Sequence, residues 1–589
     1  MPRLRAASAR PTFGALAVAL ALASTFGVVG SGSVVHDQAD QPLARGMELV
    51  GRSDLGGRGL NAAVWSYRNF AYVGTTSQRP GANASACPGW GVTIVDIANP
   101  SRPSVVGSIA QRAGTSAEDV QVLAVDSSAF RGDLMAAGLQ RCGADGSAGL
   151  SLWDVTDPRQ PSELGFFDLG RGPVGVHEFW LFRRQSQTIA LLAVPFSETL
   201  DPENQGDVRI VDLSNPRAPV QLGHWGAVRA LGLNQRGGQG RNRQTYAHSV
   251  RASPDGRFAY VAYWDGGVII LDISDLANPR YAGRTGYGPD EEGNAHSTAL
   301  AKGGRVLIEA DEDLDVRSDA LAFEGEGNLG TVEAAYGAFK AALPASEAIV
   351  GEVSYVGRGC PASGQGEADD PYLADPLGRV ALVDRGDCTS VDKVVRAQRL
   401  GAIGVLIANG EPGLPNPDGD TRDVGIPAAM IRRESAEALK DALARGEVVT
   451  VRFSAEQVRY DDWGYLRFWD IADPANPVQM ATFATEHART DKAKGPPDEG
   501  WYSAHQVVVL GERLYASWYA DGIRVVDIAD PTQPREVGFF VPPRSESGTG
   551  PGAPPPFVWG VYVRGDLILA SEERTGLYIL REVSGSAGP

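Results

Sequence analysis

Short apolar stretches at strand spacing recur along most of this chain of 589 residues. In residues 503–540 the apolar positions run or alternate over four segments, and Gly, Asp and Pro mark the corners between them. This pattern predicts a four-stranded antiparallel meander. A sheet of this size cannot bury its own faces, so we expect several copies to pack together.

The third strand of this unit is repeated, together with the turn that follows it. Each copy is a short apolar strand that ends in Asp and leads into an Asn or Asp before Pro, and the copies occupy residues 91–100, 149–158, 207–216, 267–279, 464–474 and 522–531. The final Asp recurs about every 55 to 60 residues, with one longer gap between Asp272 and Asp470. This period suits the four-stranded blade of a propeller.

These strands resemble the LVIVD repeats of bacterial and archaeal surface proteins, a family predicted to form β-propellers. The resemblance covers nearly all of the chain outside a leader and one insert. A degenerate seventh copy, residues 576–580, lacks a fourth strand, and residues 46–51 have the pattern of the fourth strands elsewhere. We therefore expect an all-β fold, a seven-bladed β-propeller of four-stranded antiparallel blades that the N-terminal strand closes.

Basic residues precede a short apolar run at the N-terminus. Arg3, Arg5 and Arg10 come before the apolar residues 13–22, and an Ala-Leu-Ala site follows at residues 21–23. This order is typical of a secretory signal peptide; an uncleaved membrane anchor is the alternative, although the run is short for a span. We expect a secreted, periplasmic or cell-surface protein that has no membrane span after cleavage.

The net charge of −18 argues against nucleic acid or an anionic membrane as the main partner, because both would be repelled. The 72 glycines agree with a β protein that has many turns. The remaining partner classes are a secreted or surface protein, a peptide or a small molecule.

The long gap between Asp272 and Asp470 holds roughly 140 extra residues, about the size of a small domain. Residues 378–409 have the pattern strand, turn, helix, strand; a further strand resumes at residue 426, and a second helix is expected over residues 435–444. The predicted domains are a signal peptide and leader (1–40), propeller blades one to the first part of five (41–316), the insert (317–457) and the rest of the propeller (458–585).

The insert resembles the α/β protease-associated (PA) domain. The residues that carry this resemblance are Arg385, Gly386, Cys388, Lys393, Ala397, Gly401, Ala402 and Gly404. The aromatic residue usually found shortly after the cysteine is replaced here by residues 389–391, Thr-Ser-Val. The resemblance implies a non-catalytic lid or docking module of the kind carried by peptidases, receptors and other secreted proteins.

The four cysteines fall into two pairs. Cys87 and Cys142 lie in equivalent loops of neighbouring blades, and Cys360 and Cys388 both lie in the insert. We predict these two disulfides, which an oxidising compartment permits.

Histidine recurs at one position of the predicted inner strands. Aligned on that position, four consecutive blades have His177, His248, His296 and His505, and the other three have Ala62, Val120 and Trp559. In a propeller this position rings the mouth of the central channel. Converging imidazoles can bind Zn or Cu, and Asp119 and Glu178 stand beside two of the positions, where a carboxylate can add or orient a ligand.

The arrangement of channel histidines resembles the selenium-binding protein or methanethiol oxidase family, in which a propeller is associated with copper. This likeness is one of arrangement and not of sequence. The alternative is that each imidazole belongs to the hydrogen bonding of the repeat itself and bridges adjacent blades.

The loops after the second strands should share the face of the histidines, and the insert leaves from one of them. We therefore expect the insert at the channel mouth and a ligand cleft there, lined by Trp264, Asp265, Asp521, Trp559, Glu572 and Glu573. Two acidic runs are weaker candidates for Ca²⁺, namely Asp311, Glu312, Asp313 and Asp315, and Asp418, Asp420 and Asp423.

The sequence contains neither a G-x-S-x-G elbow nor an H-E-x-x-H motif, and its G-x-G-x-x-G at residues 325–330 follows an acidic loop, not a strand. Two functions remain open. One is a binding scaffold with the insert as docking module. The other is a metal-dependent oxidoreductase or hydrolase that works at the histidines.

Overall fold

The computed structural model describes residues 42–583, except 78–86, 144, 236–243, 289–290, 327–328, 337–338, 340–347, 363–367, 412, 420–423, 455–457, 492–493, 499 and 545–553. The predicted leader, residues 1–40, lies outside the described residues. Among those that are described, no helix is long and apolar enough to cross a membrane.

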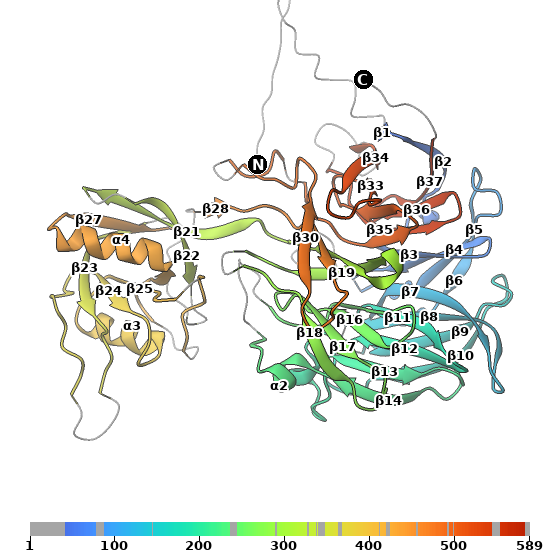
Figure 1. The fold of residues 1–589 in the computed structure, drawn as a ribbon, viewed down its shortest axis with the longest axis horizontal. Coiled ribbons are helices and arrows are strands. Elements are labelled where there is room, and N and C mark those ends of the chain that lie inside the picture. The colour runs from blue at the N-terminus through green and yellow to red at the C-terminus, as the bar shows by residue number, and fades with distance from the viewer. Residues whose placement is uncertain are drawn as a thin grey trace, which may run out of the picture. The chain divides into compact units, whose positions relative to one another are not determined.

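Within the described residues, seven four-stranded antiparallel blades form a β-propeller, coloured from blue through green to red in Figure 1, and the pairing of Thr75 with Ala117 joins the first two blades into one sheet. Blades one and two are β3 (Asn61–Tyr67), β4 (Phe70–Thr75), β5 (Val92–Asp96), β6 (Ser104–Ile109), and β7 (Thr115–Asp126), β8 (Arg131–Arg141), β9 (Gly149–Asp154), β10 (Ser162–Asp168). Blades three and four are β11 (Phe179–Arg184), β12 (Gln187–Ala193), β13 (Val208–Asp212), β14 (Val220–Trp225), and β15 (Ser249–Ala252), β16 (Phe258–Ala262), β17 (Val268–Asp272), β18 (Arg280–Arg284).

The fifth blade is completed on either side of the insert, by β19 (Ala295–Ala301), β20 (Val306–Asp311), β29 (Leu466–Asp470) and β30 (Val478–Phe483). Blade six is β31 (Val507–Leu510), β32 (Arg513–Ser517), β33 (Ile523–Asp527) and β34 (Arg535–Val541), and β1 (Leu43–Arg45) adds a strand at its edge. Blade seven is β35 (Val558–Arg564), β36 (Leu567–Glu572), β37 (Gly576–Glu582) and β2 (Met47–Ser53). Short helices are η1 (Leu55–Gly57), α1 (Ser197–Leu200), α2 (Ala227–Leu231) and η2 (Lys302–Gly304).

The N-terminal strand closes the ring, as the sequence predicts. β2 pairs with β37 in an antiparallel ladder that runs from Met47 opposite Glu582 to Ser53 opposite Leu577. The last blade therefore obtains its fourth strand from the other end of the chain, and its edge is paired instead of exposed.

The repeated Asp of the third strand shapes the turn that follows it. Asp96 accepts a hydrogen bond from Ala98 N at 2.9 Å, and the same step of two residues recurs at Asp154, Asp212, Asp272, Asp470 and Asp527. The Asn or Asp three residues after the repeated Asp makes a second such bond. Two successive side-chain turns thus reverse the chain into the fourth strand, and this explains the repeated motif.

Glycines in the fourth strands let neighbouring blades approach closely. A Cβ atom on Gly283 of β18 would lie 2.1 Å from Pro474 O in the turn of the next blade. The same contact occurs at Gly51 against Pro100 O, at 2.1 Å, and at Gly165 against Pro216 O, at 2.5 Å. Glycine is therefore required for close approach at these positions.

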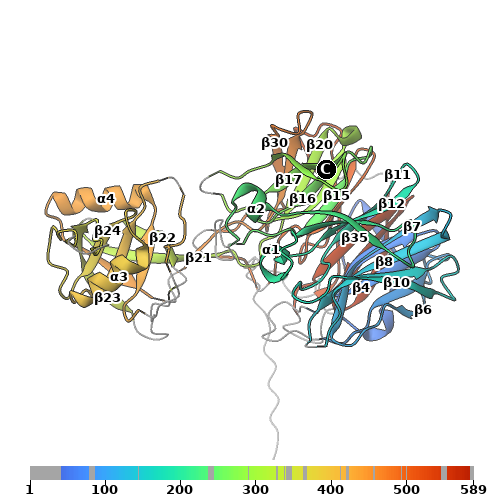
Figure 2. The same ribbon diagram turned by 90° about the horizontal axis from the view of Figure 1, so that it is seen from below.

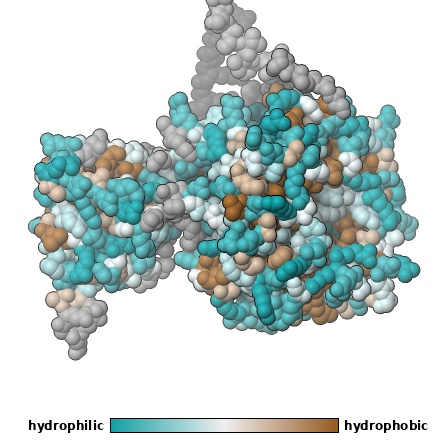
Figure 3. Space-filling view, viewed as in Figure 1, coloured by the Kyte–Doolittle hydropathy of each residue, from teal (hydrophilic) through white to brown (hydrophobic). Residues whose placement is uncertain are grey.

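Apolar side chains fill the space between blades. One buried cluster joins blades three and four through Ile189, Ile210, Val261 and Ile269, and another joins blades five and six. Figure 3 shows hydrophilic residues over most of one face of the molecule, with hydrophobic residues singly or in small groups. The core is thus distributed between the blades.

The insert is an α/β unit of its own (Figure 2). Its elements are β21 (Arg317–Gly325), β22 (Gly330–Tyr336), β23 (Ile349–Gly357), β24 (Val380–Asp384), α3 (Ser390–Arg399), β25 (Gly404–Ala408), β26 (Ala428–Ile431), α4 (Arg433–Ala444), β27 (Val449–Phe453) and β28 (Val458–Tyr460). Strands β23 to β26 pair in parallel, and α3 and α4 pack on alternate residues of β24 and β25, which places them on opposite faces of the sheet. The predicted order of strand, helix and strand is confirmed.

Both predicted disulfides are formed. The Cα atoms of Cys87 and Cys142 are 5.6 Å apart, and those of Cys360 and Cys388 are 5.8 Å apart. The first disulfide links blades one and two, and the second lies within the insert. Such bonds are typical of proteins outside the reducing cytosol.

Gly283→Ala should destabilise the propeller, because the new methyl group would overlap Pro474 O and force blades four and five apart. We expect the free energy of unfolding to fall by about 1–3 kcal/mol in urea denaturation. Gly107→Ala is the matched control, since Gly107 occupies the equivalent strand of blade one and a Cβ there meets nothing within 4 Å. Equal effects of the two variants would contradict the proposed contact between blades.

Candidate functional site

The four histidines occupy one backbone position at the start of four inner strands. His177, His248 and His505 each donate a backbone N–H to the last residue of the second strand in their own blade, Ala193 O at 3.0 Å, Ala262 O at 2.8 Å and Ser517 O at 3.0 Å. His296 is the extra residue of a bulge in β19, between Ala295 and Ser297. The strand pairing of each blade therefore fixes the backbone position from which its imidazole projects.

In the other three blades the strand pairing places Ala62, Glu118 and Trp559 at this position. The alignment on sequence therefore placed Ala62 and Trp559 correctly, but Val120 lies two residues beyond the true position in blade two. In blades one, two, five and seven the inner strand has one extra residue at this point. A shift of two residues keeps the alternation of side chains, so the apolar pattern could not distinguish Val120 from Glu118.

The imidazoles form a row across the channel. Ring centroids are 4.1 Å apart for His177 and His248, 4.0 Å for His248 and His296, and 4.0 Å for His296 and His505. His248, His296 and His505 are buried, with 5%, 1% and 1% of their surface exposed. The ring closure thus brings side chains from four separate blades into contact.

Hydrogen bonds on Nδ1 leave Nε2 available in three of the rings. His296 Nδ1 donates to His505 O at 3.1 Å, and His505 Nδ1 donates to Trp559 O at 2.7 Å. His177 Nδ1 donates to Gln140 Oε1 at 3.1 Å, because Gln140 Nε2 donates to Glu118 and so turns its oxygen to the ring. Since these acceptors carry no proton, each neutral ring keeps its lone pair on Nε2.

His248 completes the row differently. Its Nε2 lies 2.7 Å from His177 Nε2, so His248 donates to the lone pair of His177. Its Nδ1 is buried beside the His296 backbone without completing a hydrogen bond there. The row therefore bridges adjacent blades through hydrogen bonds, and it also presents unshared Nε2 lone pairs on His296 and His505.

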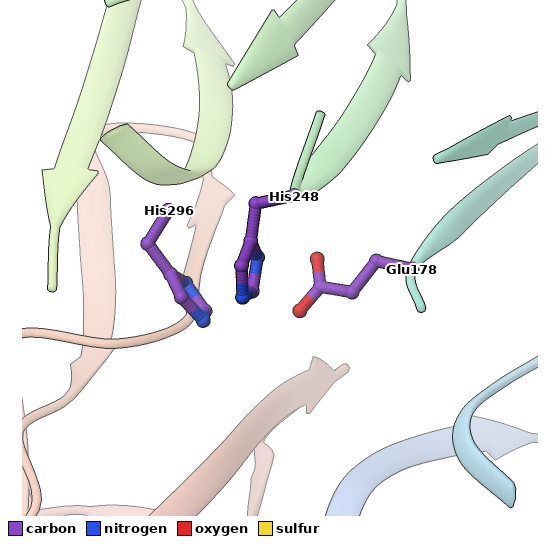
Figure 4. A group of neighbouring side chains, drawn as sticks. All are labelled: Glu178, His248 and His296. Atoms are coloured by element: carbon purple, nitrogen blue, oxygen red, sulfur yellow. The ribbon is translucent and has the colours of Figure 1, made fainter. Parts of the chain in front are cut away.

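Two carboxyl groups complete overlapping sets of possible metal ligands. Glu178, His248 and His296 form the first set (Figure 4), and His296, Glu312 and His505 form the second; within each set the ligand atoms lie within 4.8 Å of one another. Glu312 Oε2 is 3.6 Å from His296 Nε2, and Tyr519 OH donates to Glu312. Gln506 Nε2 donates to Glu178 at 3.2 Å. Ligand atoms around tetrahedral zinc are about 3.3 Å apart, so modest closure would surround an ion.

Burial determines which of these histidines and carboxyl groups carry a proton. It holds the pKa of His248 and His296 well below the usual value and lowers the pKa of His505 to about 3. Burial also raises the pKa of Glu312 to about 8 and, together with the charge of Asp119, raises the pKa of Glu178. The imidazoles are therefore neutral, the form that binds metal, and a bound cation would favour the ionised carboxylates.

A cavity of about 550 Å³ adjoins the row on the side of Glu178. Its walls are the inner strands beyond the histidines and include Asp119, Trp65, Trp180, Arg251 and Tyr562. This volume is that of a site for a small molecule.

The other predicted cleft residues divide into two groups. Trp264 and Trp559 contact the row, with ring centroids 5.2 Å from His248 and 4.9 Å from His505. The acidic residues stabilise loops. Asp265 accepts a hydrogen bond from Gln244 N, and Glu572 accepts from Phe557 N and Thr575 N. Asp521 forms ion pairs with His487 and Arg524, and Glu573 forms one with Arg574.

Of the first acidic run, Glu312 reaches the histidines. Asp311 pairs with Arg467 at 2.7 Å, Asp313 accepts from Asp315 N, and Asp315 pairs with Arg317. In the second run, Asp418 accepts from Ser390 N at 3.0 Å, and Asp420 and Asp423 lie outside the described residues.

Sequence reasoning missed a second shared position around the histidines. In blades four, five and six, the residue that follows the histidine pairs with a residue of the second strand. Trp264, Glu312 and Tyr519 each lie two residues after that paired residue. An alignment of the second strands would reveal this position, but the insert begins at residue 317, five residues after Glu312, and hides the repeat. Glu118, 3.5 Å from His177 Nδ1, occupies the histidine position of blade two and was missed because Val120 was assigned to that position.

Comparison with protein families agrees with this architecture. The model described as LVIVD repeat matches residues 88–111, 245–285 and 503–541, and the model described as PA domain matches residues 349–439. The chain carries LVIVD repeats and a PA domain.

Curated relatives match short parts of this LVIVD-repeat chain. C5a peptidase of Streptococcus pyogenes serotype M3 is 30% identical over 141 residues, which is 21% of this chain and 12% of that protein. Aminopeptidase YwaD of Bacillus subtilis is 40% identical over 72 residues, 12% and 15% of the two chains. Vacuolar-sorting receptor 2 of Arabidopsis thaliana is 36% identical over 85 residues, 13% and 14%. The chain thus spans 12–15% of the length of these relatives.

Solved structures are only distantly similar. The Cps50 (Swd1) β-propeller domain of Myceliophteria thermophila has a TM-score of 0.37 at 11% identity and covers 89% of this chain and 98% of its own. An aminopeptidase from Aneurinibacillus sp. strain AM-1 has a TM-score of 0.19 at 23% identity, over 28% and 37%. The propeller fold of this chain is shown by the pairing of its own strands.

The contribution of His505 to the stability of metal-free protein should be lost as the pH falls from about 6.5 towards about 3. The unfolded chain binds a proton near pH 6.5, whereas folded His505 has a pKa of about 3, so its contribution to stability is lost over this window. His505→Gln retains a donor for Trp559 O and should weaken the pH dependence by about 2 kcal/mol between about pH 7 and about pH 5, measured by urea denaturation.

The control for this experiment is His487→Gln. Asp521 raises the pKa of His487, so this group contributes stability below pH 6.5 that is lost as the pH rises, the opposite sign. An unchanged pH profile in His505→Gln would show that the imidazole is not buried in its neutral form.

Proposed function

We propose that this chain is a secreted or cell-surface binding protein whose propeller holds one divalent transition-metal ion in its central channel. The observation that carries this proposal is the pair of ligand sets, Glu178 with His248 and His296, and His296 with Glu312 and His505. The two disulfides and the basic and apolar leader support export.

The ligand types favour Zn²⁺ or Cu²⁺. Neutral imidazole and carboxylate ligands suit both ions, whereas Ca²⁺ and Mg²⁺ prefer shells made only of oxygen. The backbone carbonyls that accept from Nδ1 of His296 and His505 orient both rings, as partners of ligating histidines commonly do. Under this proposal the metal joins three adjacent blades and replaces the contact of His177 with His248 that holds the row together without it.

The PA domain would act as a lid or docking module for a partner protein or peptide. Its chain begins just after Glu312, a member of the second ligand set, and Val316 packs in the apolar cluster of blades five and six. Four residues, 313–316, separate Glu312 from the start of the insert at residue 317, so a movement of Glu312 on metal binding can be transmitted to the insert. This connection supports a role in which the occupied channel and the docking module act together.

A second candidate function is that of a metal-dependent enzyme, an oxidoreductase or a hydrolase. The cavity of about 550 Å³ favours it, because Glu178 both lines the cavity and belongs to the first ligand set. A small molecule in the cavity would therefore lie next to the ion.

Purified protein dialysed against buffer should contain about one Zn or Cu ion per chain when its metal content is measured by elemental analysis. Replacing His248 and His505 together by Ala removes one imidazole from each ligand set and should remove most of this metal. His224→Ala is the control, because His224 lies in β14 at the edge of blade three and belongs to neither ligand set.

Two results would contradict the proposal. One is a metal-free wild-type protein that also fails to bind added Zn²⁺ or Cu²⁺ in calorimetry. The other is equal metal content in the double variant and in wild type, which would place the ion elsewhere.

A further inference from the structure

The cavity beside the histidine row has polar groups that nothing in the protein satisfies. Among the described residues, Trp65 Nε1 and Thr298 Oγ1 are buried, line the cavity and have no hydrogen-bond partner. Thr298 is 3% exposed. Buried donors without partners are costly, so two of them in one cavity wall indicate a ligand that accepts hydrogen bonds.

Arg251 adds a charged donor to the same wall. Its Nε donates to Thr298 O at 2.6 Å, and its guanidinium lies over the Trp180 ring, with Cζ 4.1 Å from the ring centroid. These two contacts fix the plane of the group. Within the described part of the chain, its two Nη groups make no hydrogen bond and no ion pair, so they remain free to bind a carboxylate through both oxygens.

The acidic residues of the cavity do not neutralise Arg251 at contact distance. Asp119 accepts from Phe179 N at 3.0 Å and from Gln121 Nε2 at 3.3 Å. Glu178 accepts from Gln506 and belongs to the first ligand set. Both carboxyl groups act on Arg251 through their charges, but their hydrogen bonds go to other partners, so neither occupies the two Nη groups of the guanidinium.

Aromatic side chains form the apolar part of the walls. Trp65 lies 4.4 Å from Tyr562 and 6.2 Å from Trp180, measured between ring centroids. All three side chains are half-buried and line the cavity, which leaves part of their surface for a ligand. Rings of this kind favour a flat apolar body of matching shape.

We infer that the cavity binds a small aromatic carboxylic acid, with its carboxylate on Arg251 and its ring against Trp65, Trp180 and Tyr562. The inference deepens the proposed function, since Glu178 takes part in both sites. The aromatic acid is the class of ligand that would lie beside the metal ion, and its binding requires no covalent step.

Calorimetry on the metal-loaded full chain tests this assignment with benzoate and indole-3-acetate as probes, and with benzamide as the neutral counterpart of benzoate. The acids should bind and benzamide should bind at least about tenfold more weakly, because it cannot form the charge-assisted pair with Arg251. Arg251→Gln should weaken binding of the acids about 10- to 100-fold and leave benzamide nearly unchanged.

Arg183→Gln is the matched control, because Arg183 is an exposed arginine that also lines the cavity. Its acid affinity should stay within about threefold of wild type. Equal binding of benzoate and benzamide by wild type would overturn the inference, and so would equal losses in the two arginine variants. Repeating the comparison of acid with amide on metal-free protein separates the pair with Arg251 from coordination of the carboxylate to the ion, so it decides the question even where Arg251→Gln does not fold.

The inference and the proposed function fail in different ways. Protein that holds metal but binds none of the acids contradicts the inference alone. Protein that binds the acids through Arg251 but holds no metal supports the inference and contradicts the metal centre alone.

Discussion

The pairing of β2 with β37 is the interaction on which the rest of the structure depends. It joins residues 47–53 to residues 576–582 and so makes a ring from blades that each contact only their neighbours. In a closed ring the inner strands converge, and His177 and His505, which stand in blades three and six, belong to one row of imidazoles. Glycines such as Gly51 and Gly283 keep the blades at contact distance along the outer strands. The site is thus a consequence of closure and close packing, and no single blade contains it.

Polar groups in such a channel need partners, because neither imidazole nor carboxyl groups tolerate burial unpaired. The channel supplies most of them: carbonyls of the next blade accept from His296 and His505, and Tyr519 donates to Glu312. What remains is a set of lone pairs and carboxyl groups that face one another. Burial raises the pKa of Glu312 to about 8, so the proton is retained unless a cation takes its place. A metal ion would satisfy these groups together, and this electrostatic need is independent of any resemblance.

The repeats made much of the fold predictable, and the same repeats limited the prediction of the site. The Asp of each third strand forms its turn within a few residues, so Asp96 and Asp527 identify blades without knowledge of distant contacts. The histidines were found because they recur at one position. Glu118 was missed because Val120, two residues further along, was assigned to its position, and a shift of two residues keeps the apolar alternation. Glu312 was recognised only as part of an acidic run, because its partners Tyr519 and His505 lie about 200 residues away, across the insert.

X-ray absorption at the metal edge of protein loaded with one equivalent of Zn²⁺ tests the central claim most directly. The ring brings imidazoles of different blades to one ion, so the spectrum should show a shell of nitrogen and oxygen atoms near 2.0–2.1 Å with the multiple scattering of two or three imidazoles. A shell of oxygen atoms without imidazole scattering would contradict the account, because it would show that the channel histidines do not converge on a metal.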